Sequence, residues 1–209
     1  MLSALDRLIV EIDKGVRTVL GVHAGGRPTP GADLAEADLD DSARRHAAGL
    51  MRVNHCGEVC AQALYQGQAL ASGNAGLRRA LDAAAREEED HLAWTEARIR
   101  ALGGRTSRLN PLWYAGSLAM GYAAGKAGDA WNLGFLKETE RQVERHLEGH
   151  LERLDPADGR TRAIVAQMKV DETRHADMAA RLGARELPLP VKHAMAAVAK
   201  VMTTLSYRI

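Results

Sequence analysis

The stretch "REEEDHLAW", residues 86–94, places four acidic residues and one histidine in five consecutive positions. Side chains of an α-helix turn by about 100° per residue, so these five cannot all face the same way. Glu88 falls on the apolar stripe of the surrounding segment and His91 lies beside it, whereas Glu87 and Glu89 are expected to face away. Asp90 is either solvated or an outer partner. The stripe consists of Leu81, Ala84, Leu92, Thr95, Ile99 and Leu102. The segment therefore predicts a helix with a carboxylate and an imidazole on its core face.

The whole chain has the composition of an all-α protein. Ala, Leu, Glu and Arg dominate and there is one Phe, so helix formers far outnumber β-branched and aromatic residues. A length of 209 residues favours one domain, residues 1–209. Helices are predicted at residues 2–20, 39–71, 77–102, 130–154, 158–182 and 191–205. The four long ones predict a four-helix bundle at about 39–182 with one long crossover and additional N-terminal, crossover and C-terminal helices.

Charge and cysteine usage exclude some classes of protein. The formal net charge of +1 gives no basic face of the kind that binds nucleic acid. Cys56 and Cys60 lie four residues apart on a predicted helix, where they are poorly placed for a disulfide and are expected to be small buried residues of a reducing cytoplasm. Charges interrupt the N-terminal helix, so no secretory signal peptide is expected.

The other three long helices also carry acids on their apolar stripes. Glu140 occupies the stripe of helix 130–154, and both Glu172 and His175 occupy that of helix 158–182. In the first long helix, Arg52 and Glu58 are the only Lys, Arg, Asp or Glu residues from position 47 to 77. Each helix of the predicted bundle therefore has one carboxylate where its core should be.

Four buried carboxylates would be strongly destabilising unless positive charge joined them. Residues at i and i+3 share a helix face, so Glu88 with His91, and Glu172 with His175, can each grip one metal ion. Glu58 and Glu140 can then cap or bridge the two ions. Oxygen-rich ligation with imidazole favours iron or manganese over structural zinc. A single Glu-x-x-His pair is more often a solvated helix face, but two on apolar stripes indicate a two-metal site.

Ligand spacing indicates two equivalent helical hairpins. Glu58 and Glu88 are 30 residues apart, and Glu140 and Glu172 are 32 apart, so each hairpin can bring its ligands to the same height. The 49 residues from His91 to Glu140 leave room for a crossover between the hairpins.

The segments "RVNHCGEVCAQALYQGQ", "EEEDHL", "KETERQVERHLEGHLERL" and "DETRHADMA" closely resemble the bacterial di-iron demethoxyubiquinone hydroxylases of ubiquinone biosynthesis. The resemblance covers nearly the whole chain and implies a ferritin-like bundle. It carries the family's iron ligands onto Glu58, Glu88, His91, Glu140, Glu172 and His175, the residues that the stripes select. It also puts His146 near the metals as an outer-shell residue. Asn54 and Cys56 depart from the Asp and Ala common in the family.

The resemblance further implies an O2-dependent monooxygenase with two iron ions per chain, ferrous in the reduced state. One oxygen atom would enter the ring of 2-polyprenyl-3-methyl-6-methoxy-1,4-benzoquinol, giving demethylubiquinol. No G-x-G-x-x-G fingerprint is present, so electrons would come from an external donor or the quinol itself. An iron-storage or ferroxidase protein of the ferritin kind is the alternative, and manganese fits the same ligands.

Two segments suggest how the chain would meet such an apolar substrate. Residues 109–125 carry no charge but are too short and glycine-rich to span a bilayer, which favours a crossover, residues 109–129, lying in the membrane surface. Helix 191–205 has an apolar stripe and positive charges. The stripe is Val191, Met195, Val198, Met202 and Leu205, and the charges are Lys192, Lys200 and Arg208. We expect peripheral binding to the cytoplasmic side of the inner membrane. The alternatives are packing against the bundle, a homodimer surface or a ubiquinone-biosynthesis complex.

Overall fold

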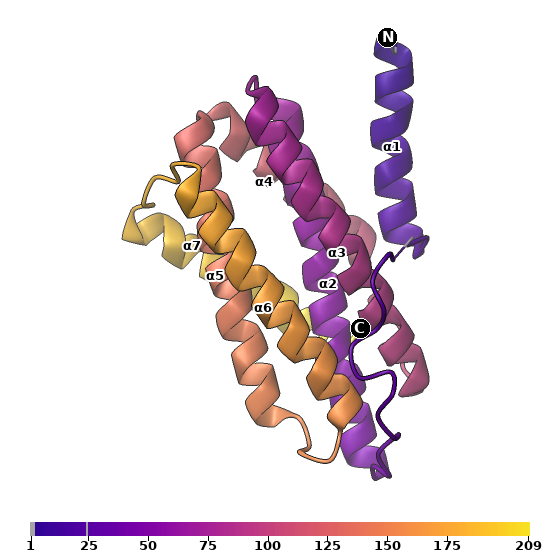
Figure 1. Cartoon of the computed structure of the whole chain (residues 1–209). Helices are drawn as coiled ribbons and strands as arrows, with labels where there is room; N and C mark the ends of the chain where they lie inside the picture. Colours follow the sequence, from indigo (N-terminus) through magenta and orange to yellow (C-terminus); the bar gives the residue numbers. More distant parts are fainter. Residues whose placement is uncertain (1–2, 24) are drawn as a thin grey trace.

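The computed structural model describes residues 3–23 and 25–209. Over these residues it contains seven helices and no strand, so the prediction of an all-α fold is confirmed (Figure 1). The helices are α1 (Ala4–Leu20), α2 (Asp41–Ala71), α3 (Ala75–Ala101), α4 (Asn110–Lys126), α5 (Asp129–Arg153), α6 (Gly159–Arg181) and α7 (Leu189–Ser206). Their ends lie within two residues of the predicted ones, except that the predicted start at residue 2 lies outside the described residues.

Helices α2, α3, α5 and α6 form the ferritin-like bundle as two hairpins (Figure 1). The short turns that close the hairpins end in residues that cap the next helix. The Asn74 side chain accepts hydrogen bonds from the backbone N–H groups of Gly76 and Leu77, and Asp158 accepts one from Thr161. Each cap satisfies backbone donors that a helix N-terminus leaves unpaired. The chain passes from the first hairpin to the second through α4.

Two apolar clusters divide the core. The first lies toward the start of α2 and the end of α3, and it includes Leu50, Met51, Trp94, Ile99, Leu147, Ile164 and Met168. The second lies toward the opposite end of the bundle and includes Tyr65, Leu77, Leu81, Leu133, Leu136 and Ala179. Along every bundle helix, the acids predicted on the stripe fall between the residues of these two clusters. A polar layer is thus enclosed by hydrophobic packing at both ends.

The crossover helix α4 packs directly along α2. A Cβ added to Gly67 would lie 2.3 Å from the carbonyl oxygen of Leu118, and one added to Gly121 would lie 2.3 Å from that of Leu64. Only glycine permits backbones to approach this closely. The outer face of α4 exposes Tyr122. The inner face therefore matches the alternative of packing against the bundle, while the outer face remains open.

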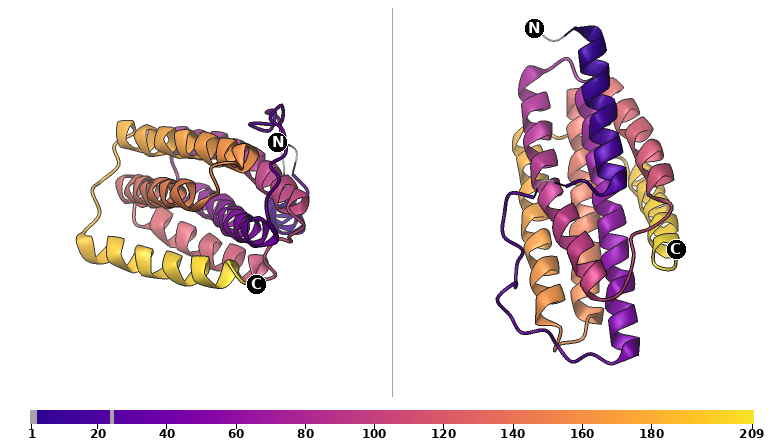
Figure 2. Two further views of the ribbon diagram at one scale, coloured as in Figure 1. Left: turned by 90° about the horizontal axis from the view of Figure 1, so that it is seen from below. Right: turned by 90° about the vertical axis from the view of Figure 1, so that its right-hand side faces the viewer.

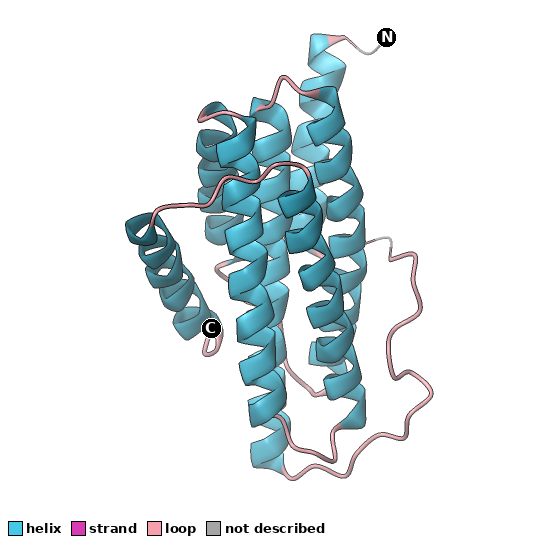
Figure 3. Ribbon diagram, turned by 60° about the vertical axis from the view of Figure 1, so that its left-hand side comes forward, coloured by secondary structure: helices cyan, strands magenta, loops and turns pink. Residues whose placement is uncertain are grey.

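Helix α7 lies across α2 and α5 and is held at both ends (Figures 2 and 3). Before it begins, the N–H of Arg185 donates to the carbonyl of Ala130 over 2.8 Å, close to Gly134. At its end, the Ser206 hydroxyl lies 3.1 Å from the sulfur of Cys56, and the Tyr207 hydroxyl lies 2.7 Å from His46. The middle of α7 thus stands over the bundle between two anchors.

Helix α1 lies beside the bundle against α2 and α4 (Figure 2). The amide of Gln66 donates to a carboxylate oxygen of Glu11 over 2.7 Å, and Gly15 leaves room for the ring of Tyr114. Most of the large apolar side chains of α1 are more than two-fifths exposed, namely Leu5, Leu8, Ile9, Val10, Ile12, Val16 and Leu20. Within residues 3–23 and 25–209, no helix combines the length and hydropathy needed to cross a bilayer.

Candidate metal centre

The six predicted ligands meet in the polar layer of the bundle. Each is at least 95 % buried, and each comes from the helix on which the sequence predicted it. They are Glu58 on α2, Glu88 and His91 on α3, Glu140 on α5, and Glu172 and His175 on α6. The fold therefore brings together the whole set that the apolar stripes selected.

Three of these residues surround the imidazole of His91. Ligand atoms of Glu58, Glu88, His91 and Glu172 all lie within 4.8 Å of one another. Nδ1 of His91 is 2.7 Å from Oε2 of Glu88 and 3.4 Å from Oε1 of Glu172. The nearest oxygen of Glu58 is 3.7 Å from the same nitrogen. These separations are of the size found between the ligands of one ion.

A second group surrounds the imidazole of His175. Ligand atoms of Glu140, Glu172 and His175 lie within 4.8 Å of one another. Nδ1 of His175 is 3.1 Å from Oε1 of Glu88 and 3.5 Å from Oε2 of Glu172. Glu88 and Glu172 therefore turn one oxygen toward each histidine, so each could reach both ions. Glu58 belongs only to the group around His91 and Glu140 only to the group around His175, so each could cap one ion.

Several polar atoms of this layer lack hydrogen-bond partners. Both carboxylate oxygens of Glu172, Oε2 of Glu140 and Nδ1 of His175 are buried without a hydrogen bond. Burial raises the pKa of Glu58, and the neighbouring Glu88 raises it further; burial and Glu172 act in the same way on the pKa of Glu140. Two divalent cations would satisfy the orphaned atoms and balance four carboxylates. The donor set thus fits a pair of metal ions.

Outer partners orient both imidazoles and one carboxylate. Asp171, fully buried on α6, lies 2.9 Å from Nε2 of His91. Glu87 lies 3.3 Å from Nε2 of His175, so the expectation that Glu87 faces away from the site is wrong. The Tyr65 hydroxyl donates a hydrogen bond to Glu140. Such contacts fix the tautomer and direction of metal-binding groups.

An arginine from the loop after α1 secures this outer layer. Nη1 of Arg27 donates to Asp171 over 2.8 Å, and Nε donates to Asp90 over 2.5 Å. The guanidinium also lies 4.7 Å from the centre of the Trp94 ring. Burial raises the pKa of Asp171, but hydrogen bonds from His91, Arg27 and Arg174 outweigh it and hold that pKa below its ordinary value. Of the two roles left open for Asp90, the structure supports that of an outer partner.

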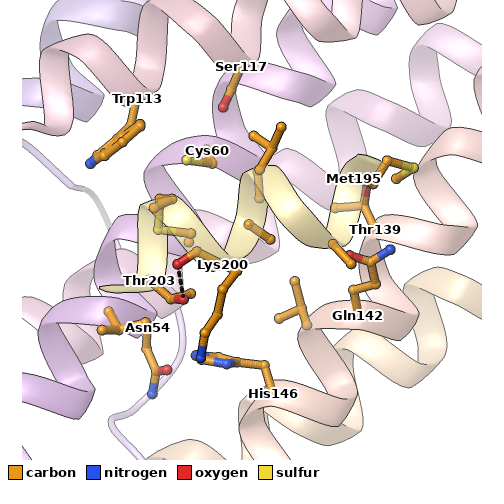
Figure 4. Close-up of a pocket in the computed structure, with 18 of the residues that line it drawn as sticks. Asn54, Cys60, Trp113, Ser117, Thr139, Gln142, His146, Met195, Lys200 and Thr203 are labelled. Carbon is orange, nitrogen blue, oxygen red and sulfur yellow. Dashed lines mark hydrogen bonds between the residues drawn. The ribbon is translucent and has the colours of Figure 1, made fainter. Parts of the chain in front are cut away.

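A cavity of about 1100 Å³ reaches the polar layer of the bundle, because Glu58 is one of its lining residues. Figure 4 shows part of its lining, including Asn54, His146 and Met195. The cavity lies between α2, α4, α5 and α7, and its lining is mainly apolar. Leu50, Val53, Leu64, Leu112, Met195 and Val198 contribute to this lining. Val191, Met195, Val198 and Met202 of the apolar stripe of α7 thus line the cavity, whereas Leu205 at the end of the stripe does not.

His146 lies in the wall of this cavity. Its ring is 4.0 Å from that of His150, and Figure 4 shows the Lys200 side chain reaching toward it. Burial, aided by the charges of Arg153 and Lys200, lowers the pKa of His146 to about 4. Among the described residues, no hydrogen bond joins His146 to any of the six predicted ligands. An outer-shell role for His146 therefore stays a prediction.

Comparisons with known proteins agree with this architecture. A family model described as "Ubiquinone biosynthesis protein COQ7" matches residues 45–206. A relative from Chromobacterium violaceum is 64% identical, over 98% of this chain and 100% of its own. One from Azoarcus sp. (strain BH72) is 60% identical, over 98% of this chain and 99% of its own. Both carry the name 3-demethoxyubiquinol 3-hydroxylase. The chain therefore belongs to the COQ7 family of ubiquinone biosynthesis proteins.

Proposed function

We propose that this chain is a 3-demethoxyubiquinol 3-hydroxylase that holds two iron ions between Glu58, Glu88, His91, Glu140, Glu172 and His175. The observation that carries the proposal is the contact between a buried, cation-deficient ligand layer and a large apolar cavity, which meet at Glu58. When bound, two ferrous ions would supply the activation of O2 that aromatic hydroxylation requires. One oxygen atom enters the quinol ring and the other leaves as water, with two electrons from an external donor or the quinol.

The protein's own residues prepare the ligands. A carboxylate can only accept a hydrogen bond, so Nε2 of His91 donates to Asp171. Nδ1, which faces Glu88 and Glu172, is then the nitrogen that could bind a metal in place of a proton. Glu87 acts in the same way on His175. Tyr65 donates to Oε1 of Glu140 and so fixes the direction of that carboxylate. These contacts favour rapid, ordered binding of the two ions.

The cavity suits a polyprenyl quinol. Its apolar lining can exclude water from the ring and accept the isoprenoid tail, and Glu58 brings the ring close to the proposed metals. Trp113 and Thr139 also line it, from α4 and α5 respectively. The volume of about 1100 Å³ exceeds what a quinol ring alone needs, so a large part of it is available for the tail.

We also propose that the chain binds the cytoplasmic surface of the inner membrane peripherally. The exposed apolar side chains of α1 and the outer face of α4 support this, because a soluble surface seldom exposes so many large apolar groups together. Liposome flotation tests it. Wild-type protein is expected to float with anionic vesicles, and Ile12→Glu is expected to reduce the floating fraction. Equal flotation of the two would contradict docking through α1, and a homodimer or a ubiquinone-biosynthesis complex would then be the candidate that covers this face.

Quinone profiling tests the reaction itself. A strain without the hydroxylase is supplied with wild-type protein, Glu172→Ala, Glu88→Ala or the control Glu152→Ala, which removes an exposed acid of α5. Wild type and control should restore ubiquinone, whereas the two ligand variants should accumulate the demethoxy precursor. Normal ubiquinone in the ligand variants would refute the proposal, and iron far above two ions per chain would instead favour the storage alternative. Metal analysis of active protein separates iron from manganese.

A further inference from the structure

A second group of metal-ligating side chains lies outside the six-residue layer. It comprises His23 from the loop after α1, His55 from α2 and Glu96 from α3. Their ligand atoms all lie within 4.8 Å of one another. Nε2 of His23 is 3.9 Å from Oε2 of Glu96. The rings of His23 and His55 pack edge to face, with their centres 6.1 Å apart. None of the three belongs to the proposed di-iron centre.

His55 is a buried polar side chain without a partner. It is 98 % buried, because only 2 % of its surface is exposed, and neither of its ring nitrogens makes a hydrogen bond. Nε2 of His23 is likewise buried and unpaired. A buried imidazole normally has at least one partner, since burying an unsatisfied polar group destabilises the fold. The orphaned nitrogens point to a missing ligand.

The protonation state of these histidines suits a metal ion. Burial lowers the pKa of His55 to about 3, and burial together with Arg17 lowers the pKa of His23. Both are therefore neutral at physiological pH and keep a lone pair for coordination. Two imidazoles and one carboxylate are a known zinc donor set, with the fourth tetrahedral position left to water.

The backbone delivers His23 to this place. Gly21 ends α1 in the left-handed conformation, with φ of 73°. A Cβ at Gly21 would lie 2.7 Å from Oε1 of Glu96, so glycine lets the loop pass close to α3. The same loop continues to Gly26, whose N–H donates to Asp90 over 2.5 Å. Residues 21–27 except 24 thus run along α3 from Glu96 to Asp90.

Two arginines oppose a cation at this site. Arg17 and Arg100 are the positive charges that depress the histidine pKa values. Arg100 already donates to Oε1 of Glu96 over 2.6 Å, which leaves Oε2 facing His23. Binding must therefore rest on the metal–imidazole bonds rather than on net charge, which favours a borderline ion over Mg²⁺ or Ca²⁺.

We propose that His23, His55 and Glu96 form a third metal site, for Zn²⁺, which ties the loop after α1 to α2 and α3. The ion would fasten the segment that carries Arg27 to the bundle. Its role is structural and is separate from O2 chemistry. The site adds one ion to the two of the hydroxylation centre.

Metal counting tests this site. Full-length chain is loaded anaerobically with Fe²⁺, incubated with Zn²⁺, freed of excess metal by gel filtration and analysed for both elements. Wild type is expected to hold one zinc in addition to two irons. His23→Gln and Glu96→Gln should lose the zinc and keep both irons, whereas His193→Gln, an exposed histidine of α7, should behave as wild type. Zinc that enters wild type only by displacing iron would overturn the proposal.

Two further measurements protect the test against misfolding of a variant. At 100 times its Kd, Zn²⁺ should raise the Tm of iron-loaded wild type by about 5–10 °C and leave that of His23→Gln unchanged. Zinc-edge absorption of wild type should show two imidazoles at about 2.0–2.1 Å with oxygen completing the shell. An equal Tm rise in both proteins, or a shell with other than two imidazoles, would refute the site.

Discussion

Replacing Arg27 by alanine would release the outer layer of the metal centre. Arg27 is the one side chain that hydrogen-bonds to both Asp90 and Asp171 among the described residues, and Asp171 in turn holds Nε2 of His91. Without it, the fully buried Asp171 keeps only the partly exposed Arg174, Gln167 and the imidazole as partners. We expect both the stability of the fold and its affinity for iron to fall.

The size of the effect follows from the contacts. Hydrogen bonds to charged groups contribute about 1.5–3 kcal/mol each, and Arg27 makes one through Nε and one through Nη1. Its side chain is 34% exposed, so solvent screening reduces this sum. The expected loss is about 2–4 kcal/mol in the free energy of unfolding, or about 5–15 °C in Tm. Iron affinity should fall about 10–100-fold, as for other outer partners of metal ligands.

Urea unfolding and iron titration of Arg27→Ala measure the two losses. Arg27→Lys keeps the charge but reaches only one acid at a time, so it should lie between the alanine variant and wild type. Arg79→Ala removes an exposed arginine of α3 and should change stability by less than about 0.5 kcal/mol. If Arg27→Ala matched Arg79→Ala in both stability and iron affinity, the proposed role of the loop in holding the ligands would be refuted.

Two other predictions concern the cavity wall and the crossover. Burial holds the pKa of His150 at about 2, below its ordinary 6.5, so the unfolded chain takes up the proton first and stability falls as the pH drops below about 6.5. His150→Asn should therefore reduce the loss of unfolding free energy between pH 6.5 and 5 by about 1.6 kcal/mol in urea titrations, and an equal loss in both proteins would contradict this. Gly121→Ala should lower the stability by about 1–3 kcal/mol, because its Cβ would meet the Leu64 carbonyl at 2.3 Å. Gly116 lies on the same helix, and a Cβ added there would have no neighbour within 4 Å, so Gly116→Ala should leave the thermal midpoint unchanged or raise it. Similar losses of stability at both glycines would show that the close α2–α4 contact is not the cause.

The spacing of apolar residues was enough to predict the inward-facing acids. On a helix of a bundle, the positions that repeat with the helical period are the ones that lie on the buried face. Tyr65 follows Glu58 by seven residues, two turns along the same face, so the same reasoning could have found it. Asp171 could not be found in this way, because it is adjacent to Glu172 and points about 100° away. Only the packing of α6 beside α3 turns it toward His91.

The contacts of residues outside regular helices could not be predicted from helical periodicity. Arg27 lies in a glycine- and proline-rich loop, whose path has no period, and its partners are 63 and 144 residues away in the chain. Periodicity also revealed the apolar stripe of α7 without revealing what it faces. An apolar stripe predicts burial. The structure was needed to show that most of the stripe lines a cavity and that Leu205, at its end, is exposed.

The two anchors of α7 have a mechanical consequence. The helix is fastened near Gly134 at one end and at Cys56 and His46 at the other, while its middle stands over the cavity. A helix that is held mainly at its ends and has few buried contacts can move at its centre at a low cost in free energy. Displacing this one helix outward would widen the cavity. The four helices that carry the carboxylates would stay in place, so such an opening would leave the candidate metal centre undisturbed.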